Sequence, residues 1–385
     1  MERCERVSNG AVQVVSEDSA PSVMKILFLG QLTEGQTSRM RMDALCSLGH
    51  EIISLDSHTG WLTCSLPARI IQKKLLRGPI ITQLNQDVLA LTKRHRPDLL
   101  WGEKQEYLFP DTLNQIQSMG TKLLYFTPDP YFSLPWKRTP FMDEGMTIFD
   151  YAVTSKRYEL EDYHRTCRQV IYMPLGFSEG AHRPFVPADP IQRLHYTSDV
   201  GFLGGWEPRR EKLLNAIAQT GCDLKIWGYA WDHLVDGKWS PRRALRLKIL
   251  AGSESFKIQR NDQLAAALRG GEVYGDAYAW ALSGARISVG FLRHTWPDQH
   301  TTRTFEIPAC ASMMLADRTE EHQEFFEEGH EAEFFSSQEE LVDKVRFYLG
   351  NEPAREKVAL KGYDRCYRSQ YSYRSRISRV LDQIA

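Results

Sequence analysis

An arginine and a glutamate stand three positions apart, as Arg303 and Glu306, at the start of a run of small and apolar residues, "RTFEIPACASMMLAD". A guanidinium can hold a phosphate through two parallel hydrogen bonds, and a carboxylate can accept hydrogen bonds from two hydroxyls of a sugar ring. Together with Asp298 upstream, they suit a ribose that carries a diphosphate. The same spacing is that of an exposed ion pair on a helix, worth about 0.2–0.5 kcal/mol, so spacing alone leaves both interpretations open.

A second charged segment, "GFLGGWEPRREK", joins a predicted strand to a predicted helix. The strand ends at Gly204 and Gly205, and Arg209 and Arg210 fall in the first turn of the helix. Basic side chains there oppose the helix dipole by about 0.3–1 kcal/mol each, whereas the free backbone N–H groups favour an anion. The segment therefore predicts either an anion site or arginines that extend into water along a solvated face.

Three further charged residues follow predicted strands in the first half of the chain. Asp129, in "FTPDPYF", could orient an acceptor hydroxyl or take up its proton, or it could cap the turn between its flanking prolines. Glu103 and Lys104 come directly after "LLWG" and are candidates of the same kind. The sequence does not choose between a catalytic and a structural role for these residues.

Short apolar runs alternate with helical segments in two series, and the charged residues above follow these runs. Two such series predict two doubly wound α/β domains. In open sheets of this kind ligands bind beyond the carboxyl ends of the strands, so two domains would share a cleft. The expected strands are residues 24–30, 50–57, 97–102, 121–129, 149–155 and 169–176 in the first series, and 199–204, 222–228, 271–275, 285–291 and 312–317 in the second.

Composition places the domain boundaries. Residues 1–22 are acidic and lack the apolar core of a signal peptide, and prolines with little periodicity mark a linker over 177–197. Ser38 is the expected N-cap of the first helix. The expected units are a disordered tail over 1–23, a first domain over 24–180, a second domain over 198–368, and a helix over 369–385 that crosses back to the first domain.

The bulk numbers exclude several classes of protein. The formal net charge is −1, so no overall field draws the chain to nucleic acid. The 7 cysteines form no CxxC pair, which is typical of reduced thiols in a cytoplasm. No stretch approaches the roughly 18 apolar residues of a membrane span. We expect a soluble, cytoplasmic protein without nucleic-acid partners.

The common cofactor motifs are absent. The segment "GQLTEGQTSR" follows the first predicted strand but matches neither GxGxxG nor a P-loop. His294 and His300 flank Asp298, but their spacing fits no common metal-ligand pattern. We therefore expect no metal and no cofactor.

The C-terminal half resembles one group of enzymes. The stretches "RTFEIPAC", "FFEEGHEAEFF", "SQEEL" and "YSYRSR", in this order within 303–377, look like the C-terminal half of the CgeB-type (spore-maturation-like) glycosyltransferases. That group has the GT-B fold and is related to the retaining, glycogen-synthase-like transferases. Weaker similarity, including "VGFLGG" and "LLYFTPDP", extends the resemblance over residues 24–380. It implies two Rossmann-like domains facing a central cleft, the first for an acceptor and the second for a donor.

The resemblance also implies roles for single residues. Related transferases bind the ribose of a nucleotide through the second glutamate of an E-x7-E motif, which corresponds to Glu306. Asp298 takes the place of the first glutamate, near the sugar, and Arg303 would hold the diphosphate. Val273 and Tyr274 stand where the base is received.

The phosphate loop differs from the family pattern. Relatives carry Gly-Arg at the end of the first strand of the donor domain, whereas this chain has Gly204 and Gly205. The phosphate charge would then come from Arg209 or Arg210.

The implied function is metal-independent, hexosyltransferase-like transfer of a sugar from a nucleotide diphosphosugar, with UDP expected rather than GDP. The acceptor, whether a small molecule, a glycan or a protein, is not identified by the sequence, and retention of configuration is expected from the family alone. Two alternatives stay open. One is a nucleotide-sugar epimerase or hydrolase of the same fold, and the other is a catalytically degenerate sugar-nucleotide-binding protein.

One segment, 232–263, departs from the family pattern. It interleaves basic residues with Trp239 and several leucines and isoleucines. It could form a hairpin that recognises the acceptor or a membrane surface. It could also form a helix that packs or contacts a partner, which the nearly neutral overall charge favours.

Overall fold

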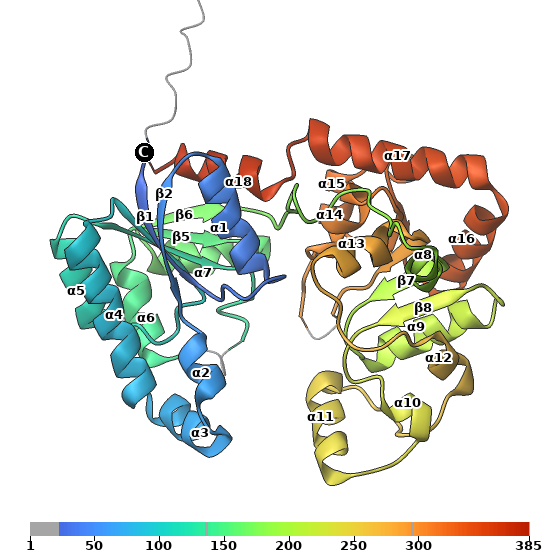
Figure 1. The fold of residues 1–385 in the computed structure, drawn as a ribbon, viewed down its shortest axis with the longest axis horizontal. Helices are drawn as coiled ribbons and strands as arrows, with labels where there is room; N and C mark the ends of the chain where they lie inside the picture. The colour runs from blue at the N-terminus through green and yellow to red at the C-terminus, as the bar shows by residue number, and fades with distance from the viewer. Residues whose placement is uncertain (1–22, 135–137, 294–295, 385) are drawn as a thin grey trace, which may run out of the picture.

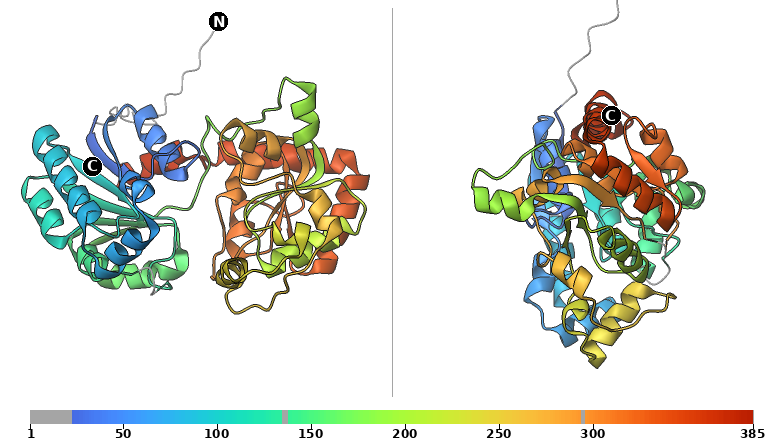
Figure 2. Two further views of the ribbon diagram at one scale, coloured as in Figure 1. Left: turned by 60° about the horizontal axis from the view of Figure 1, so that its bottom comes forward. Right: turned by 90° about the vertical axis from the view of Figure 1, so that its right-hand side faces the viewer.

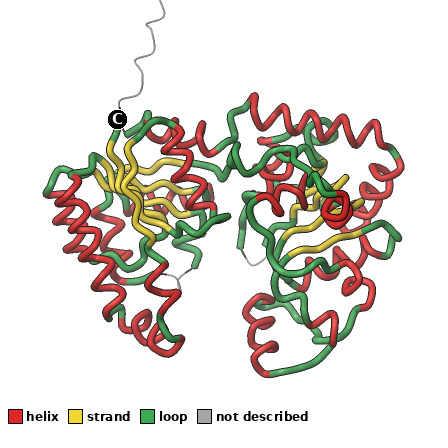
Figure 3. The backbone as a smooth tube through the Cα atoms, viewed as in Figure 1, coloured by secondary structure: helices red, strands yellow, loops and turns green. Residues whose placement is uncertain are grey.

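The chain folds into two α/β domains, each built on one parallel sheet (Figure 1). The computed structural model describes residues 23–134, 138–293 and 296–384. The strand order is β2-β1-β3-β4-β5-β6 in the first sheet and β11-β10-β9-β7-β8 in the second, and helices cover both sheets (Figure 3). The predicted architecture of two doubly wound domains is confirmed. The predicted tail, except for Val23, lies outside the described residues.

All six strands expected in the first domain are present. β1, β3, β4 and β5 are buried along almost their whole length, which is why they appear in the sequence as continuous apolar runs. The strands are β1 (Lys25–Gly30), β2 (Glu51–Asp56), β3 (Leu99–Glu103), β4 (Lys122–Thr127), β5 (Tyr151–Thr154) and β6 (Gln169–Tyr172). The helices are α1 (Thr37–Ser47), α2 (Thr59–Thr63), α3 (Leu66–Leu75), α4 (Pro79–His95), α5 (Pro110–Ser118), α6 (Pro140–Ile148), the 3-10 helix η2 (Arg157–Glu159) and α7 (Leu160–Thr166).

The first helix starts before its expected N-cap. α1 begins at Thr37, after the extended residue Gln36, and Ser38 is buried within the first turn. Ser38 packs against Gly30 at the end of β1, where an added Cβ would lie 2.2 Å from the serine oxygen. The prediction of Ser38 as N-cap is therefore wrong, because this serine fills space beside β1.

The second domain contains four of the five expected strands, β7 to β10. The strands are β7 (Ser198–Leu203), β8 (Leu224–Trp227), β9 (Ala285–Gly290), β10 (Met313–Asp317) and β11 (Glu333–Phe335). The helices are α8 (Pro190–Tyr196), α9 (Pro208–Ala218), α10 (His233–Asp236), α11 (Pro241–Ala251), α12 (Asp262–Ala267), α13 (Asp276–Ser283), α14 (Arg303–Ala309), α15 (Glu320–Phe325), α16 (Gln338–Gly350) and α17 (Glu352–Arg368). The last helix, α18 (Tyr373–Leu381), packs against the first domain.

The expected strand over 271–275 is wrong. This segment is a loop that leads into α13, and its last residue, Gly275, has φ of +56°. β7 pairs directly with β8 and β9, so the sheet leaves no place for another strand between them. β11 extends the sheet beside β10 and has only three residues, too few for an apolar pattern to reveal. α8 lies within the expected irregular linker.

The segment 232–263 forms helices and no hairpin. α12 packs against α9 and β8, and α10 packs against α12. The expectation of a hairpin is therefore wrong, and the packing interpretation holds for α10 and α12. A membrane or partner contact of this segment stays a prediction. α11 lies at one end of the second domain (Figure 1).

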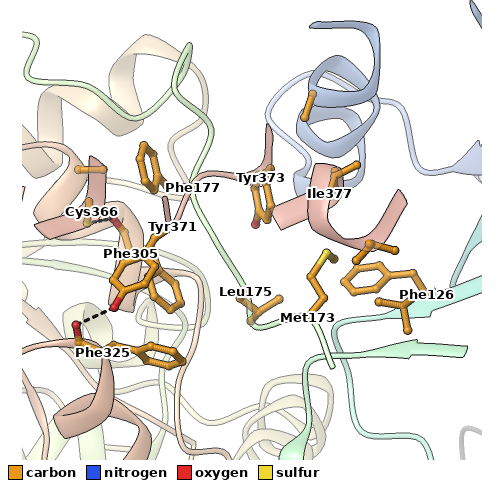
Figure 4. Close-up of a cluster of buried hydrophobic side chains, with 14 of the residues drawn as sticks. Phe126, Met173, Leu175, Phe177, Phe305, Phe325, Cys366, Tyr371, Tyr373 and Ile377 are labelled. Atoms are coloured by element: carbon orange, nitrogen blue, oxygen red, sulfur yellow. Dashed lines mark hydrogen bonds between the residues drawn. The ribbon is translucent and has the colours of Figure 1, made fainter. Parts of the chain in front are cut away.

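Two stretches of chain cross between the domains. Residues 173–177 leave the first domain after β6, and the turn after α17 leads to α18, which packs against α1 (Figure 2). The N–H of Tyr373 donates to the carbonyl of Phe177 at 2.8 Å. One buried apolar cluster surrounds both crossings and extends from Phe126 in the first domain to Phe305 in the second (Figure 4). The crossings thus hold the domains in the arrangement that forms the site.

Candidate active site between the two domains

A pocket of about 270 Å³ lies between the two domains. Its first-domain wall is the loop after β1 with the start of α1. Its second-domain wall is formed at the carboxyl ends of β7 and β8, in the loop before α13, and by α14, as expected for parallel sheets. The lining residues are Gly35, Gln36, Thr37, Met40, Ala181, His182, Leu203, Gly204, Gly205, Trp227, Gly228, Tyr229, Glu272, Val273, Tyr274, Gly275, Tyr278, Arg303 and Glu306.

The structure brings together most of the residues singled out in the sequence. They come from three separate stretches of the second domain, and the fold joins these stretches at one edge of its sheet. The singled-out residues that line the pocket are Gly204, Gly205, Val273, Tyr274, Arg303 and Glu306, whereas Arg209, Arg210, Asp298 and Asp129 are not among its lining residues.

Glu306 is a buried carboxylate at the pocket wall, with only 2% of its surface exposed. One of its oxygens accepts a hydrogen bond from the Tyr278 hydroxyl at 2.5 Å. Burial, together with Glu306, raises the pKa of Tyr278 well above its ordinary value, so the phenol keeps its proton and remains a donor. Arg303 Nη1 lies 3.9 Å from the carboxylate. Because Glu306 is buried, however, the two residues are not the exposed ion pair that their spacing also allowed.

His182, from the linker, faces the other oxygen of Glu306. Its Nε2 lies 3.7 Å from Glu306 Oε1, and its Nδ1 accepts the backbone N–H of Ser178 at 3.0 Å. Burial lowers the pKa of His182, so the ring is neutral and, with Nδ1 accepting, carries its proton on Nε2. Glu306 therefore accepts one hydrogen bond, from Tyr278, and faces His182 Nε2 beyond hydrogen-bond distance, which leaves it acceptor capacity for hydroxyls in the pocket.

Arg303 lies half-buried at the same wall. Its guanidinium packs over the Tyr278 ring, with 5.5 Å from Cζ to the ring centre, and Nη1 donates to Thr302 Oγ1 at 3.2 Å. A guanidinium has five N–H donors in a fixed fork, so Arg303 can bind an anion in the pocket while it keeps this bond.

Arg209 and Arg210 do not line the pocket and instead bind other protein groups. Arg209 donates to both oxygens of Asp317, at 3.3 and 2.5 Å. Arg210 is buried and donates to the carbonyls of Gly205 at 3.0 Å and Phe291 at 3.2 Å. Burial lowers the pKa of Arg210 to about 10. The solvated-face interpretation is wrong for Arg210, which supports the glycine loop from behind. A phosphate contact of either arginine stays a prediction.

Arg293 and Tyr229 are neighbours of the glycine loop that sequence reasoning missed. Arg293 donates to the Tyr229 hydroxyl at 3.0 Å and lies 2.9 Å from a carboxylate oxygen of Glu207. The Tyr229 ring covers Gly205, where an added Cβ would be 2.5 Å from the ring. Arg293 therefore brings a second cation close to the pocket. No motif marks it, because it stands alone in the loop after β9.

Asp298 connects the domains rather than lining the pocket. Its carboxylate accepts hydrogen bonds from Lys156 Nζ at 2.7 Å and from the Tyr158 hydroxyl at 2.9 Å, both in the first domain. The Lys156 and Asp298 side chains are nearly buried. Burial and Asp298 raise the pKa of Tyr158 above its ordinary range, which keeps this phenol a donor. The role of Asp298 near the sugar stays a prediction.

The three first-domain candidates separate into two kinds. Asp129 is half-buried, with one carboxylate oxygen 2.9 Å from Lys104 Nζ, close to the ends of β4 and β3. Glu103 is buried and accepts two hydrogen bonds of 2.7 Å from the guanidinium of Arg41. Glu103 is therefore a structural partner of α1 and not an exposed acid, which corrects its status as a catalytic candidate.

The described part of the chain holds no group of three or more histidine, cysteine, aspartate or glutamate side chains that could bind a metal ion. His294 lies outside this part.

Comparisons with known proteins agree with this architecture. Residues 209–382 match a family described as glycosyl transferase-like, and a comparison of the sequence with curated proteins gives no match. Sucrose-phosphate synthase from Thermosynechococcus elongatus superposes with a TM-score of 0.60 at 13% identity, over 94% of this chain and 99% of that one. HepE from Anabaena, solved with UDP and glucose, gives 0.58 at 11% identity over 94% and 99% of the two chains. A glycosyltransferase from Rickettsia africae gives 0.58 at 13% identity over 94% and 97%.

At these identities the solved structures establish the fold, and the family match adds the character of the second half of the chain. The chain therefore has the GT-B fold, and its residues 209–382, which include Arg303 and Glu306, are glycosyl transferase-like in sequence.

Proposed function

We propose that this protein is a glycosyltransferase that takes a sugar from a UDP-sugar and transfers it to an acceptor bound by the first domain. The observation that carries the proposal is the pairing of Glu306, a buried carboxylate, with the Arg303 guanidinium in one pocket between two GT-B domains. The HepE structure, which contains UDP and glucose, supports the choice of nucleotide.

The donor would lie along the second-domain wall. The ribose hydroxyls would donate to Glu306, and Arg303 would bind the diphosphate. The base would rest against Val273 and Tyr274. The diphosphate would lie against the loop of Gly204 and Gly205, which lines the pocket.

Catalysis would depend mainly on the stabilisation of the leaving UDP. Negative charge develops on the diphosphate as the glycosidic bond breaks, and the positive charge of Arg303 is already in place to stabilise it. This would make the reaction metal-independent. We further propose Asp298 as a group near the transferred sugar, positioned by Lys156 and Tyr158, and Asp129 as the group that orients the acceptor hydroxyl. Retention of configuration follows the family expectation.

A panel of nucleotides tests this function. Calorimetry and thermal-shift measurements would compare UDP, UDP-glucose, UDP-N-acetylglucosamine, GDP-mannose and ADP-glucose. At 100 times its Kd, a bound nucleotide adds about 2.7 kcal/mol of stability. We expect binding of UDP and at least one UDP-sugar, with slow release of UDP from that sugar. An epimerised sugar nucleotide would identify an epimerase, binding without turnover a degenerate binding protein, and binding of none of the five would contradict the proposal.

The variant Gly228→Ala is expected to weaken UDP binding by about tenfold or more and to lower stability by about 1–3 kcal/mol. Gly228 has φ of +153°, and an added Cβ would lie 1.9 Å from the carbonyl oxygen of Gly204. The methyl group would push apart the two loops that form the pocket wall.

The matched control is Gly221→Ala. Gly221 also has a positive φ, +83°, but an added Cβ there meets nothing within 4 Å. Backbone strain alone should cost about 1 kcal/mol there and leave UDP binding unchanged. Equal UDP affinity in Gly228→Ala and the wild type, measured by calorimetry, would show that the loop contact does not shape the pocket.

A further inference from the structure

Helix α3 turns its apolar face toward solvent. Its exposed aliphatic side chains are Leu66, Ile70, Ile71 and Leu75, with 47–66% of their surfaces exposed. Around the helix axis these positions fall within one half of the circumference, at 100° per residue. A globular protein normally directs such a face into its core, whereas in α3 the buried residue is the polar Gln72. An exposed apolar face of this kind marks an interaction site.

The same region is strongly basic. The segment 57–86 contains Arg69, Lys73, Lys74 and Arg77 and no aspartate or glutamate. Leu62 of α2, 69% exposed, adds to the apolar surface beside them.

Helix α11 in the second domain repeats this combination. Leu245 and Ile249 are 63% and 71% exposed, and Trp239, just before the helix, is 66% exposed. The segment 237–253 contains five basic residues and no acidic one. Two of the five, Arg243 and Arg246, pair with Asp232 and Asp236 just before it. The opposite face of α11 is anchored, since Leu247 is fully buried.

The two helices lie at the same end of the molecule, one in each domain. They form its lower end in Figure 1 and also in the right-hand view of Figure 2, away from α17 and α18. Basic residues of 57–86 and 237–253 thus lie at the same end as exposed leucine, isoleucine and tryptophan, although the formal charge of the whole chain is only −1.

We propose that this end of the molecule, the α3–α11 surface, binds peripherally to a bilayer that contains anionic lipids. The basic side chains complement lipid headgroups, and the aliphatic chains and Trp239 fit the boundary between headgroups and acyl chains. Nucleic acid would account for the basic residues but not for exposed leucine and isoleucine, because phosphate contacts come from charged and polar groups. Within the described ranges, none of the helices has the length and hydrophobicity of a membrane-spanning segment.

Vesicle co-sedimentation of the full chain tests this surface. The probes are vesicles of pure phosphatidylcholine and vesicles with 30% phosphatidylglycerol, a fraction of about one lipid in three chosen so that the surface is clearly anionic. We expect binding to the anionic vesicles only, with an affinity that falls as salt increases.

Paired substitutions separate the contribution of the basic side chains to vesicle binding from that of the apolar side chains. Lys74→Glu with Arg77→Glu is expected to weaken vesicle binding about 25-fold or more, since each basic residue at the surface contributes about fivefold. Ile70→Ser with Ile71→Ser, and Leu245→Ser with Ile249→Ser, should each weaken it by about tenfold or more.

The controls lie on α16 and α17, at the other end. Phe347 and Leu360 are 55% and 58% exposed, so Phe347→Ser with Leu360→Ser should bind vesicles as the wild type does. The same holds for Lys357→Glu with Lys361→Glu. Nucleotide affinity should be unchanged in all five pairs, so this test and the test of donor binding can fail independently.

Four outcomes would overturn the membrane surface. They are absence of binding to anionic vesicles, equal binding to both vesicle types, equal loss in the control variants, and a dimer that buries α3 or α11 in solution. Binding of heparin or RNA without vesicle binding would assign the surface to a polyanion.

Discussion

Replacing Glu306 by alanine should weaken UDP binding by about 30- to 1,000-fold, or about 2–4 kcal/mol. The carboxylate is buried at the pocket wall and held by Tyr278, so it is already oriented before a nucleotide arrives. Alanine would remove the acceptor for both ribose hydroxyls and leave the Tyr278 hydroxyl without its partner. Arg303→Ala should cause a loss of similar size, because a charge-assisted contact to the diphosphate disappears.

Calorimetry with UDP measures both losses, and two controls accompany it. Glu356→Ala removes an exposed carboxylate of α17 and should change nothing. Arg209→Ala removes an arginine that binds Asp317 outside the pocket. Comparing its UDP affinity with that of Arg303→Ala shows which of the two arginines contributes to nucleotide binding. If Glu306→Ala and Arg303→Ala, both still folded, bind UDP as the wild type does, the site assignment is wrong.

Replacing Arg41 by alanine should lower the free energy of unfolding by about 3–5 kcal/mol. Arg41 and Glu103 are 1% and 2% exposed and joined by two hydrogen bonds of 2.7 Å. Burial alone would lower the pKa of Arg41, but Glu103 raises it above its ordinary value. Alanine would leave the Glu103 charge buried without a partner. It would also remove the guanidinium that packs against Tyr373 of α18, 5.3 Å from the ring centre.

Urea denaturation measures this loss, with Arg39→Ala as the matched control. Arg39 lies on the same helix and pairs with Asp43 at 3.0 Å, but both side chains are about half exposed. Such a pair contributes about 0.2–1 kcal/mol. The double variant Arg41→Met with Glu103→Leu should recover much of the stability, because no buried charge is left unpaired. A loss in Arg41→Ala no larger than in Arg39→Ala would contradict this interpretation.

The fold was predictable from the sequence where a single stretch of chain contains the apolar pattern of a strand. Ten of the strands coincide with expected segments, and the signal is clearest in β1, β3, β4 and β5, because strands buried on both faces must be apolar. The segment 271–275 misled the prediction, because its glycines and apolar residues fit a short strand as well as the loop before α13. β11 is too short to carry any pattern.

The candidate site was predictable to the extent that its residues lie close together in sequence. Arg303 and Glu306 share one turn of α14, so their spacing already indicated joint action. His182, Tyr278 and Arg293 come from the linker, α13 and the loop after β9, and only the fold brings them to Glu306 and to the glycine loop. The roles assigned to Asp298 and Asp129 stay predictions.

A crystal structure of the protein with bound UDP would show directly which residues bind the nucleotide. We expect the ribose hydroxyls within hydrogen-bond distance of Glu306 and the diphosphate between Arg303 and the loop of Gly204 and Gly205. UDP bound elsewhere, or UDP in this pocket with neither Glu306 nor Arg303 in contact with it, would show that the proposed donor site is wrong.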